Sequence, residues 1–107
     1  MIKAVVLLKR KDELSAQAFA DWLLKEHLPM VLKLPGLRRY QANIAVDPDD
    51  DFDGFSELWF DSEDAMLSAY GTELGKAVAA DSLAHVKLRK RFVVQEHPFE
   101  PPTSSEA

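Results

Sequence analysis

The chain contains no cysteine among its 107 residues. Disulfide bonds, thiolate nucleophiles and zinc–thiolate centres are therefore excluded. Basic side chains are also scarce, since 13 Lys and Arg stand against 18 Asp and Glu, for a formal charge of −5. A chain without excess cations gains little from contact with phosphates, so we expect no nucleic-acid partner.

Long apolar runs are lacking as well. No stretch approaches the roughly 20 apolar residues that a membrane-spanning helix needs, and the opening MIKAVVLLK shows no signal-peptide pattern. We therefore expect no membrane partner and a cytoplasmic location.

With 47% apolar residues, the chain can form one small domain, which we place at residues 1–98. Residues 99–107 are expected to be a flexible tail.

Four segments have the short, apolar, β-branched or aromatic character of strands. They are residues 2–9, 37–46, 55–60 and 87–97. The acidic segment between the second and third of them reads as a hairpin loop.

Two helical regions separate these strands. Ser15 is a candidate N-cap of the first helix, which Pro29 should end or kink near His27. The second helical region should stop near Gly71 and restart with Thr72 as a cap.

The resulting order, β-α-β-β-α-β, predicts an α+β, ferredoxin-like subunit. Its antiparallel four-stranded sheet carries helices on one face. The predicted strands are apolar on both faces, although one chain supplies helices for only one of them. We therefore expect a second copy of the chain to cover the other face, which makes the protein a homodimer.

His27 and Tyr40 are the candidate catalytic residues. A histidine titrates near neutral pH, as a general acid or base must. The alternative is that His27 only stabilises the end of its helix. Tyr40 shares a predicted strand face with Ala42 and Ile44, so its phenol should be buried and should need a hydrogen-bond partner. His27 and a backbone group are the two candidates for that partner.

Three segments resemble the EthD family of dimeric α/β-barrel proteins. They are F-x-x-W-x-x-x-x-H-x-P at residues 19–29, L-P-G-L-x-x-Y at residues 34–40 and GFSELWFDS at residues 54–62. The resemblance implies that two ferredoxin-like sheets pair face to face into a dimeric α/β barrel. It also implies a pocket for a small molecule between the helices and the sheet of each subunit. Four further side chains are expected to bind substrate there: Trp22, Ser56, Leu58 and Phe60.

The methylmuconolactone isomerases, relatives of the EthD proteins, offer a catalytic comparison. Their histidine at the end of the first helix and their tyrosine on the second strand match His27 and Tyr40. Their second active-site histidine has no counterpart among residues 47–54, and their third-strand cysteine corresponds to Leu58. The chain therefore carries half of that constellation.

Three other features have structural explanations. Glu57 should pair with Arg39 or with a base of the partner subunit. The D-x-D-x-D-G pattern at residues 49–54 opens like a calcium loop, but Phe60 stands where the bidentate glutamate is required, so we expect no metal site. The basic segment 87–91 should be solvated or should pair with an acidic loop.

These observations favour a small enzyme of catabolism or secondary metabolism that needs no cofactor. It would act on a small apolar organic compound as an isomerase, a cyclase or an oxidoreductase. His27 would shuttle a proton, and Tyr40 would orient or polarise an oxygen of the substrate. The alternatives are a non-catalytic protein that binds a small molecule and a stress-type dimer without a ligand.

Overall fold

The computed structural model describes residues 1–102 and shows four strands and five helical segments in that range. The strands are β1 (Ile2–Arg10), β2 (Arg39–Ile44), β3 (Gly54–Phe60) and β4 (Val86–Val94). The helical segments are α1 (Ala16–Asp21), η1 (Trp22–His27), α2 (Leu28–Val31), α3 (Glu63–Tyr70) and α4 (Glu73–His85).

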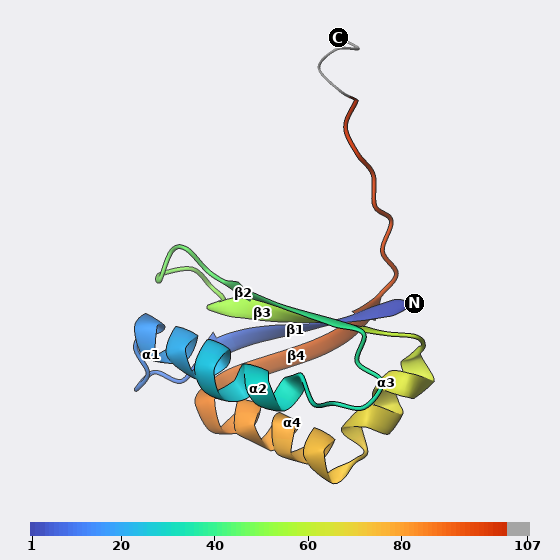
Figure 1. Cartoon of the computed structure of the whole chain (residues 1–107). Helices are drawn as coiled ribbons and strands as arrows, with labels where there is room; N and C mark the ends of the chain where they lie inside the picture. The colour runs from blue at the N-terminus through green and yellow to red at the C-terminus, as the bar shows by residue number, and fades with distance from the viewer. Residues whose placement is uncertain (103–107) are drawn as a thin grey trace.

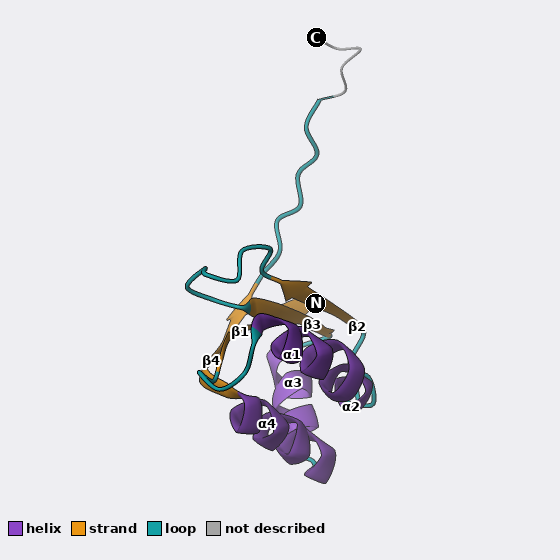
Figure 2. Ribbon diagram, turned by 90° about the vertical axis from the view of Figure 1, so that its left-hand side faces the viewer, coloured by secondary structure: helices purple, strands orange, loops and turns teal. Residues whose placement is uncertain are grey.

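The strands form one sheet in the order β2-β3-β1-β4, and every neighbouring pair is antiparallel. All helical segments lie on the same side of this sheet (Figures 1 and 2). The ferredoxin-like α+β prediction is confirmed. Two expected strands are shorter than predicted, because β2 spans six residues and β4 ends at Val94.

The core fills the space between the helices and the sheet. Strand β1 contributes Ala4, Val6 and Leu8, each at most 4% exposed. Because side chains alternate along a strand, these three residues point to the helical face together with Leu58 of β3, which lies opposite Ala4. The first helical region covers them with Phe19, which is 1% exposed.

Within residues 1–102 no helix covers the opposite face of the sheet (Figures 1 and 2). Phe55, Leu88 and Phe92 stand on this face and are 37–43% exposed. They lie opposite Leu7, Lys9 and Val5 of β1, so they belong to the set that points away from the core. The prediction that the strands are apolar on both faces is therefore confirmed for β1 and β3, whereas β4 is apolar on its outer face and carries Arg89 and Arg91 on its helical face.

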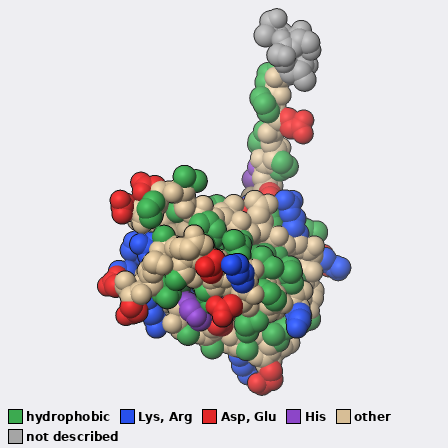
Figure 3. Space-filling view, turned by 60° about the vertical axis from the view of Figure 1, so that its left-hand side comes forward, with side chains coloured by type: hydrophobic (Ala, Val, Ile, Leu, Met, Phe, Trp, Pro, Cys, Tyr) green, Lys and Arg blue, Asp and Glu red, His purple; other side chains and the backbone are tan. Residues whose placement is uncertain are grey.

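One face of the molecule carries charges of both signs. Acidic, basic and apolar side chains are interspersed over the face that Figure 3 presents. Within residues 1–102 no helix is long and apolar enough to cross a membrane.

The helix starts follow the predicted capping pattern. The hydroxyls of Ser15, Ser62 and Thr72 accept hydrogen bonds from backbone N–H groups three residues later, at 3.0–3.1 Å. The predicted caps at Ser15 and Thr72 are confirmed. Of the two outcomes predicted for Pro29, an end or a kink near His27, the end is wrong, because the first helical region continues through η1 and α2 to Val31.

Gly75, in the first turn of α4, lies against the end of α3. A Cβ atom at this position would stand 2.5 Å from Cα of Tyr70 and would also meet the carbonyl oxygen of Ala69. Gly75→Ala should therefore destabilise the protein by about 1–3 kcal/mol, although alanine is the better helix former. Chemical denaturation measures this effect. As a control, Ser68→Ala on the exposed side of α3 should stay within about 0.5 kcal/mol of the wild type; equal stability of the two variants would contradict the tight approach of α4.

Candidate functional site

A π-helical segment, η1, interrupts the first helical region. Its hydrogen bonds run from residue i+5 to residue i, as between the N–H of Leu28 and the carbonyl of Leu23. Pro29 follows at the start of α2 and has no N–H to donate. Short π segments occur frequently at functional sites.

The π geometry places Trp22 and His27 on one side of the helix. In an α-helix, residues five apart point about 140° away from each other, because each residue turns the chain by about 100°. In η1 the two side chains meet instead, with ring centroids 4.8 Å apart. Both are buried, at 2% and 5% exposure. The structure thus selects His27 over Glu26, which is exposed, as the inward side chain of this turn.

Asp81 of α4 binds both rings. Its Oδ2 accepts a hydrogen bond from Nε1 of Trp22 at 3.1 Å and one from Nδ1 of His27 at 2.8 Å. Since a carboxylate can only accept, the Nδ1 atom of His27 carries a proton. The second ring nitrogen, Nε2, then holds a lone pair, which faces the hydroxyl of Ser82 at 3.3 Å. The pair resembles the carboxylate–imidazole arrangement that fixes a catalytic histidine in one tautomer.

His85 supports Asp81 from the next turn of α4. Its Nδ1 donates to the backbone carbonyl of Asp81 at 2.8 Å and lies 3.6 Å from Oδ1. Its ring stacks on Trp22, with a centroid distance of 4.5 Å and an interplanar angle of 17°. Trp22 is therefore fixed by a hydrogen bond at its edge and by an imidazole on its face.

The pKa of His27 is lowered from its ordinary value of 6.5. Burial is the largest cause, and the charge of Arg89 and the neighbouring His85 act in the same direction. The hydrogen bond and the charge of Asp81 oppose this shift without reversing it. His27 is therefore neutral at pH 7, a state in which it can accept a proton.

Tyr40 finds its partner on the neighbouring strand. Its hydroxyl lies 2.7 Å from Oγ of Ser56, which stands on β3 with 4% exposure. The expected partnership with His27 is wrong, because Asp81 and Ser82 hold both ring nitrogens of that residue. Burial raises the pKa of Tyr40 above its usual value, so its phenol keeps its proton at neutral pH.

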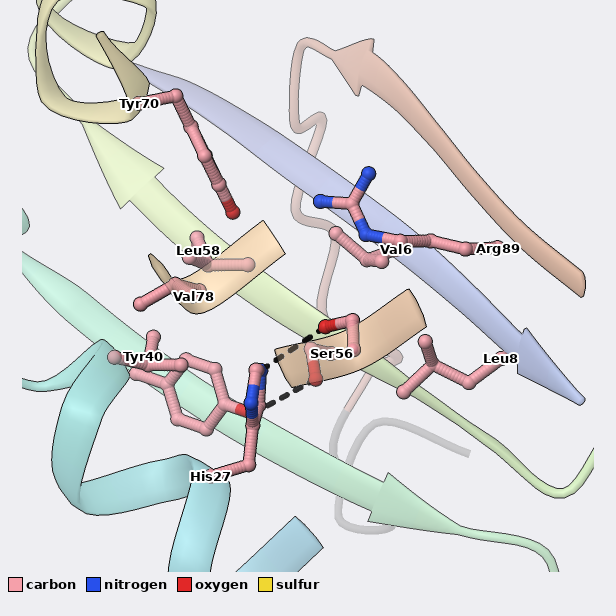
Figure 4. Close-up of a pocket in the computed structure, with 11 residues that line it drawn as sticks. Val6, Leu8, His27, Tyr40, Ser56, Leu58, Tyr70, Val78 and Arg89 are labelled. Atoms are coloured by element: carbon pink, nitrogen blue, oxygen red, sulfur yellow. Dashed lines mark hydrogen bonds between the residues drawn. The ribbon is translucent and has the colours of Figure 1, made fainter. Parts of the chain in front are cut away.

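His27 and Tyr40 nevertheless line the same pocket, between the helices and the sheet (Figure 4). The pocket holds about 260 Å³ of empty space including its open mouth, and its interior has room for little more than a water molecule. The lining residues come from all four strands and from four of the helical segments. They are Val6, Leu8, His27, Val31, Tyr40, Ser56, Leu58, Tyr70, Val78, Ser82 and Arg89.

The four expected substrate-binding residues divide into two groups. Ser56 and Leu58 line the pocket. Trp22 and Phe60 are buried in the core, at 2% and 0% exposure, and are not among the residues that line this pocket. Trp22 acts on the pocket through Asp81 instead.

Three polar residues of the site were not predicted from the sequence: Ser82 and Arg89, which line the pocket, and Asp81, which binds His27. An Asp-Ser pair in the otherwise apolar stretch AVAADSLA was a usable signal. Arg89 was expected in a solvated basic segment, but alternation along β4 turns it to the helical face and into the pocket. That expectation was wrong for Arg89.

The remaining sequence candidates have structural roles. Glu57 pairs with Nζ of Lys3 at 2.7 Å and with Nδ2 of Asn43 at 2.9 Å. Burial raises the pKa of Glu57, but these two hydrogen bonds outweigh burial and leave the pKa below its usual value. Asp53 of the acidic loop is buried and pairs with Arg10. Among residues 1–102 no group of three His, Asp or Glu side chains is arranged to hold a metal ion.

The lowered pKa of His27 makes stability depend on pH. Below about pH 6.5 the unfolded chain takes up a proton on this residue while the folded chain resists it, so the free energy of unfolding should fall. Above pH 6.5 this contribution should be complete. Urea denaturation between about pH 5.5 and pH 7.5 measures the slope.

His27→Gln should flatten this slope, whereas His97→Gln, at an exposed position, should keep it. A slope that survives in His27→Gln would contradict the assignment.

Comparisons with known proteins agree with the fold. The family model described as "EthD domain" matches residues 11–88. A crystal structure of an EthD family protein from Bacillus halodurans C-125 aligns with a TM-score of 0.79 and 26% identity, over 91% of this chain and 99% of that one. A search among curated proteins found no match.

Two more distant structures show the same fold. A dimeric protein of unknown function with a ferredoxin-like fold, from Bacteroides fragilis NCTC 9343, aligns with a TM-score of 0.70 and 15% identity, over 89% of this chain and 95% of that one. SnoaB, a cofactor-independent oxygenase from Streptomyces nogalater, aligns with a TM-score of 0.69 and 13% identity, over 94% and 97%.

Proposed function

Because this chain belongs to the EthD family, we propose that its pocket widens beyond its present interior space to bind a small, largely apolar organic compound and that His27 transfers a proton to or from it. One observation carries this proposal: Asp81 holds Nδ1 of His27 at 2.8 Å, while the same imidazole lines the pocket. A histidine with only a helix-capping role would not need a half-buried carboxylate partner.

His27 is the proton acceptor in this proposal. Burial keeps its imidazole neutral, and Asp81 stabilises the imidazolium that forms when Nε2 takes up a proton. Ser82 lies 3.3 Å from Nε2, which is a long contact that a substrate can replace. The same imidazolium can return the proton at another carbon, which completes an isomerisation. In a cyclisation the carbanion would instead attack a carbonyl of the same molecule, and the imidazolium would protonate the alkoxide that forms.

Tyr40 is the electrophilic partner. Its raised pKa keeps the phenol protonated, so the hydroxyl can donate to an oxygen of the substrate as negative charge develops there. Ser56 fixes this hydroxyl at 2.7 Å. Leu58 and Val78 supply apolar walls that select an apolar substrate.

The proposed chemistry requires no cofactor. Proton removal next to a carbonyl or phenol needs only a base and a donor to the oxygen. The structural similarity to SnoaB, whose description names it a cofactor-independent oxygenase, is consistent with such chemistry on this fold. Oxidoreductase, isomerase and cyclase activities all begin from this step.

We further propose that the protein is a homodimer that buries the outer face of the sheet. Phe55, Leu88 and Phe92 expose apolar surface there, and exposed apolar clusters on a sheet favour association. The neighbouring structure from Bacteroides fragilis is described as dimeric. Pairing of the two outer faces gives the dimeric α/β barrel.

Deuterium exchange tests the proton transfer without knowledge of the natural substrate. A panel of β-dicarbonyl compounds, lactones and phenols is incubated with the protein in D₂O, and NMR measures exchange at the acidic C–H positions. The wild type should accelerate exchange of at least one compound. His27→Gln should slow it by at least about 100-fold, because a positioned base typically contributes 10²–10⁴-fold. His97→Gln should exchange at the wild-type rate.

The result also separates the alternatives. Compounds that bind without accelerated exchange would identify a non-catalytic binding protein. Exchange that persists in His27→Gln would remove His27 from the proposal.

A further inference from the structure

Arg89 presents to the pocket a cation without a carboxylate partner, whose Cζ lies 6.0 Å from the ring centroid of Tyr70. It lies opposite Leu8 on the central strand β1, and its side chain lines the pocket with His27 and Tyr40 (Figure 4). Its Nε atom is fully buried, and no hydrogen-bond acceptor for it exists within residues 1–102. In a folded protein a buried donor without an acceptor is rare, because its hydrogen bond to water is lost and no hydrogen bond within the protein replaces it.

No carboxylate compensates the charge of Arg89 in the described part of the chain. Its electrostatic neighbours are the phenol of Tyr70 and a second cation, Arg91. The carboxylate of Asp81 is already committed to Trp22 and His27. Burial consequently lowers the pKa of Arg89, although a guanidinium remains charged at neutral pH.

We propose that Arg89 binds the carboxylate of the substrate, which makes the substrate class a small organic acid with an apolar remainder. A carboxylate supplies both the missing acceptor and the missing negative charge, and a guanidinium binds it through two parallel hydrogen bonds. Val6, Leu58 and Val78 line the same pocket and can contact the apolar remainder. This inference rests on the proposed function in one respect: it names the substrate class of the same pocket.

Arg91 provides a matched control. It stands two residues further along β4, on the same face of the sheet, and its guanidinium lies 4.5 Å from the ring centroid of Tyr70. It is not among the residues that line the pocket. The two arginines thus differ chiefly in access to the pocket.

Calorimetric titration with acetate, butyrate and benzoate tests the proposal, each compared with its primary amide at constant ionic strength. At least one acid should bind the wild type at least tenfold more tightly than its amide. Arg89→Met should abolish this preference, and Arg91→Met should keep the affinity within about twofold. NMR of the Arg89 Nε–H should show a shift on addition of the acid that binds, which gives a second readout in the wild type itself.

Three outcomes would overturn the proposal: equal binding of acids and amides, which indicates that water satisfies Nε; unchanged acid binding in Arg89→Met; and no binding of any acid in the series. His27→Gln separates this proposal from the proton transfer. If it binds the acid normally but the wild type accelerates no exchange, the carboxylate site stands and the catalytic proposal fails.

Discussion

The carboxylate of Asp81 is the group on which the organisation of the site depends. It joins helix α4 to segment η1 through hydrogen bonds to Trp22 and His27 at 3.1 and 2.8 Å. The π-helical geometry of η1 makes this double contact possible, since it brings Trp22 and His27, five residues apart, to the same carboxylate. Without Asp81, His27 would lose its fixed tautomer, and the buried indole N–H of Trp22 would lose its acceptor.

The pocket combines a neutral base with an uncompensated cation. The charge of Arg89 contributes to the lowered pKa of His27. If a carboxylate pairs with Arg89 as proposed, we expect it to oppose that contribution and to raise the pKa of His27. An acidic substrate would thus prepare the imidazole for proton transfer as it binds. A neutral molecule of the same shape would not, which gives the pocket a chemical basis for selectivity beyond its volume.

The fold was predictable from the sequence because its signals are local: strand alternation, the caps at Ser15 and Thr72, and the order of elements. His27 and Tyr40 could be recognised as site candidates for the same reason. Their partners could not, since Asp81 lies 54 residues from His27, and nothing local distinguishes Arg89 from the cations around it. The length of the first helical region was predicted too short at Pro29. The proline follows the π segment η1 and lies in the first turn of α2, where its missing N–H is tolerated.

The central claim is that Asp81 fixes His27 as a neutral imidazole with its lone pair on Nε2. Long-range ¹H–¹⁵N NMR at pH 7 observes this directly, because protonated and unprotonated ring nitrogens have well-separated chemical shifts. In the wild type we expect a protonated Nδ1 and an unprotonated Nε2 for His27. In Asp81→Ala we expect both tautomers of the neutral imidazole to be populated. An imidazolium at pH 7, or a proton on Nε2, would contradict it.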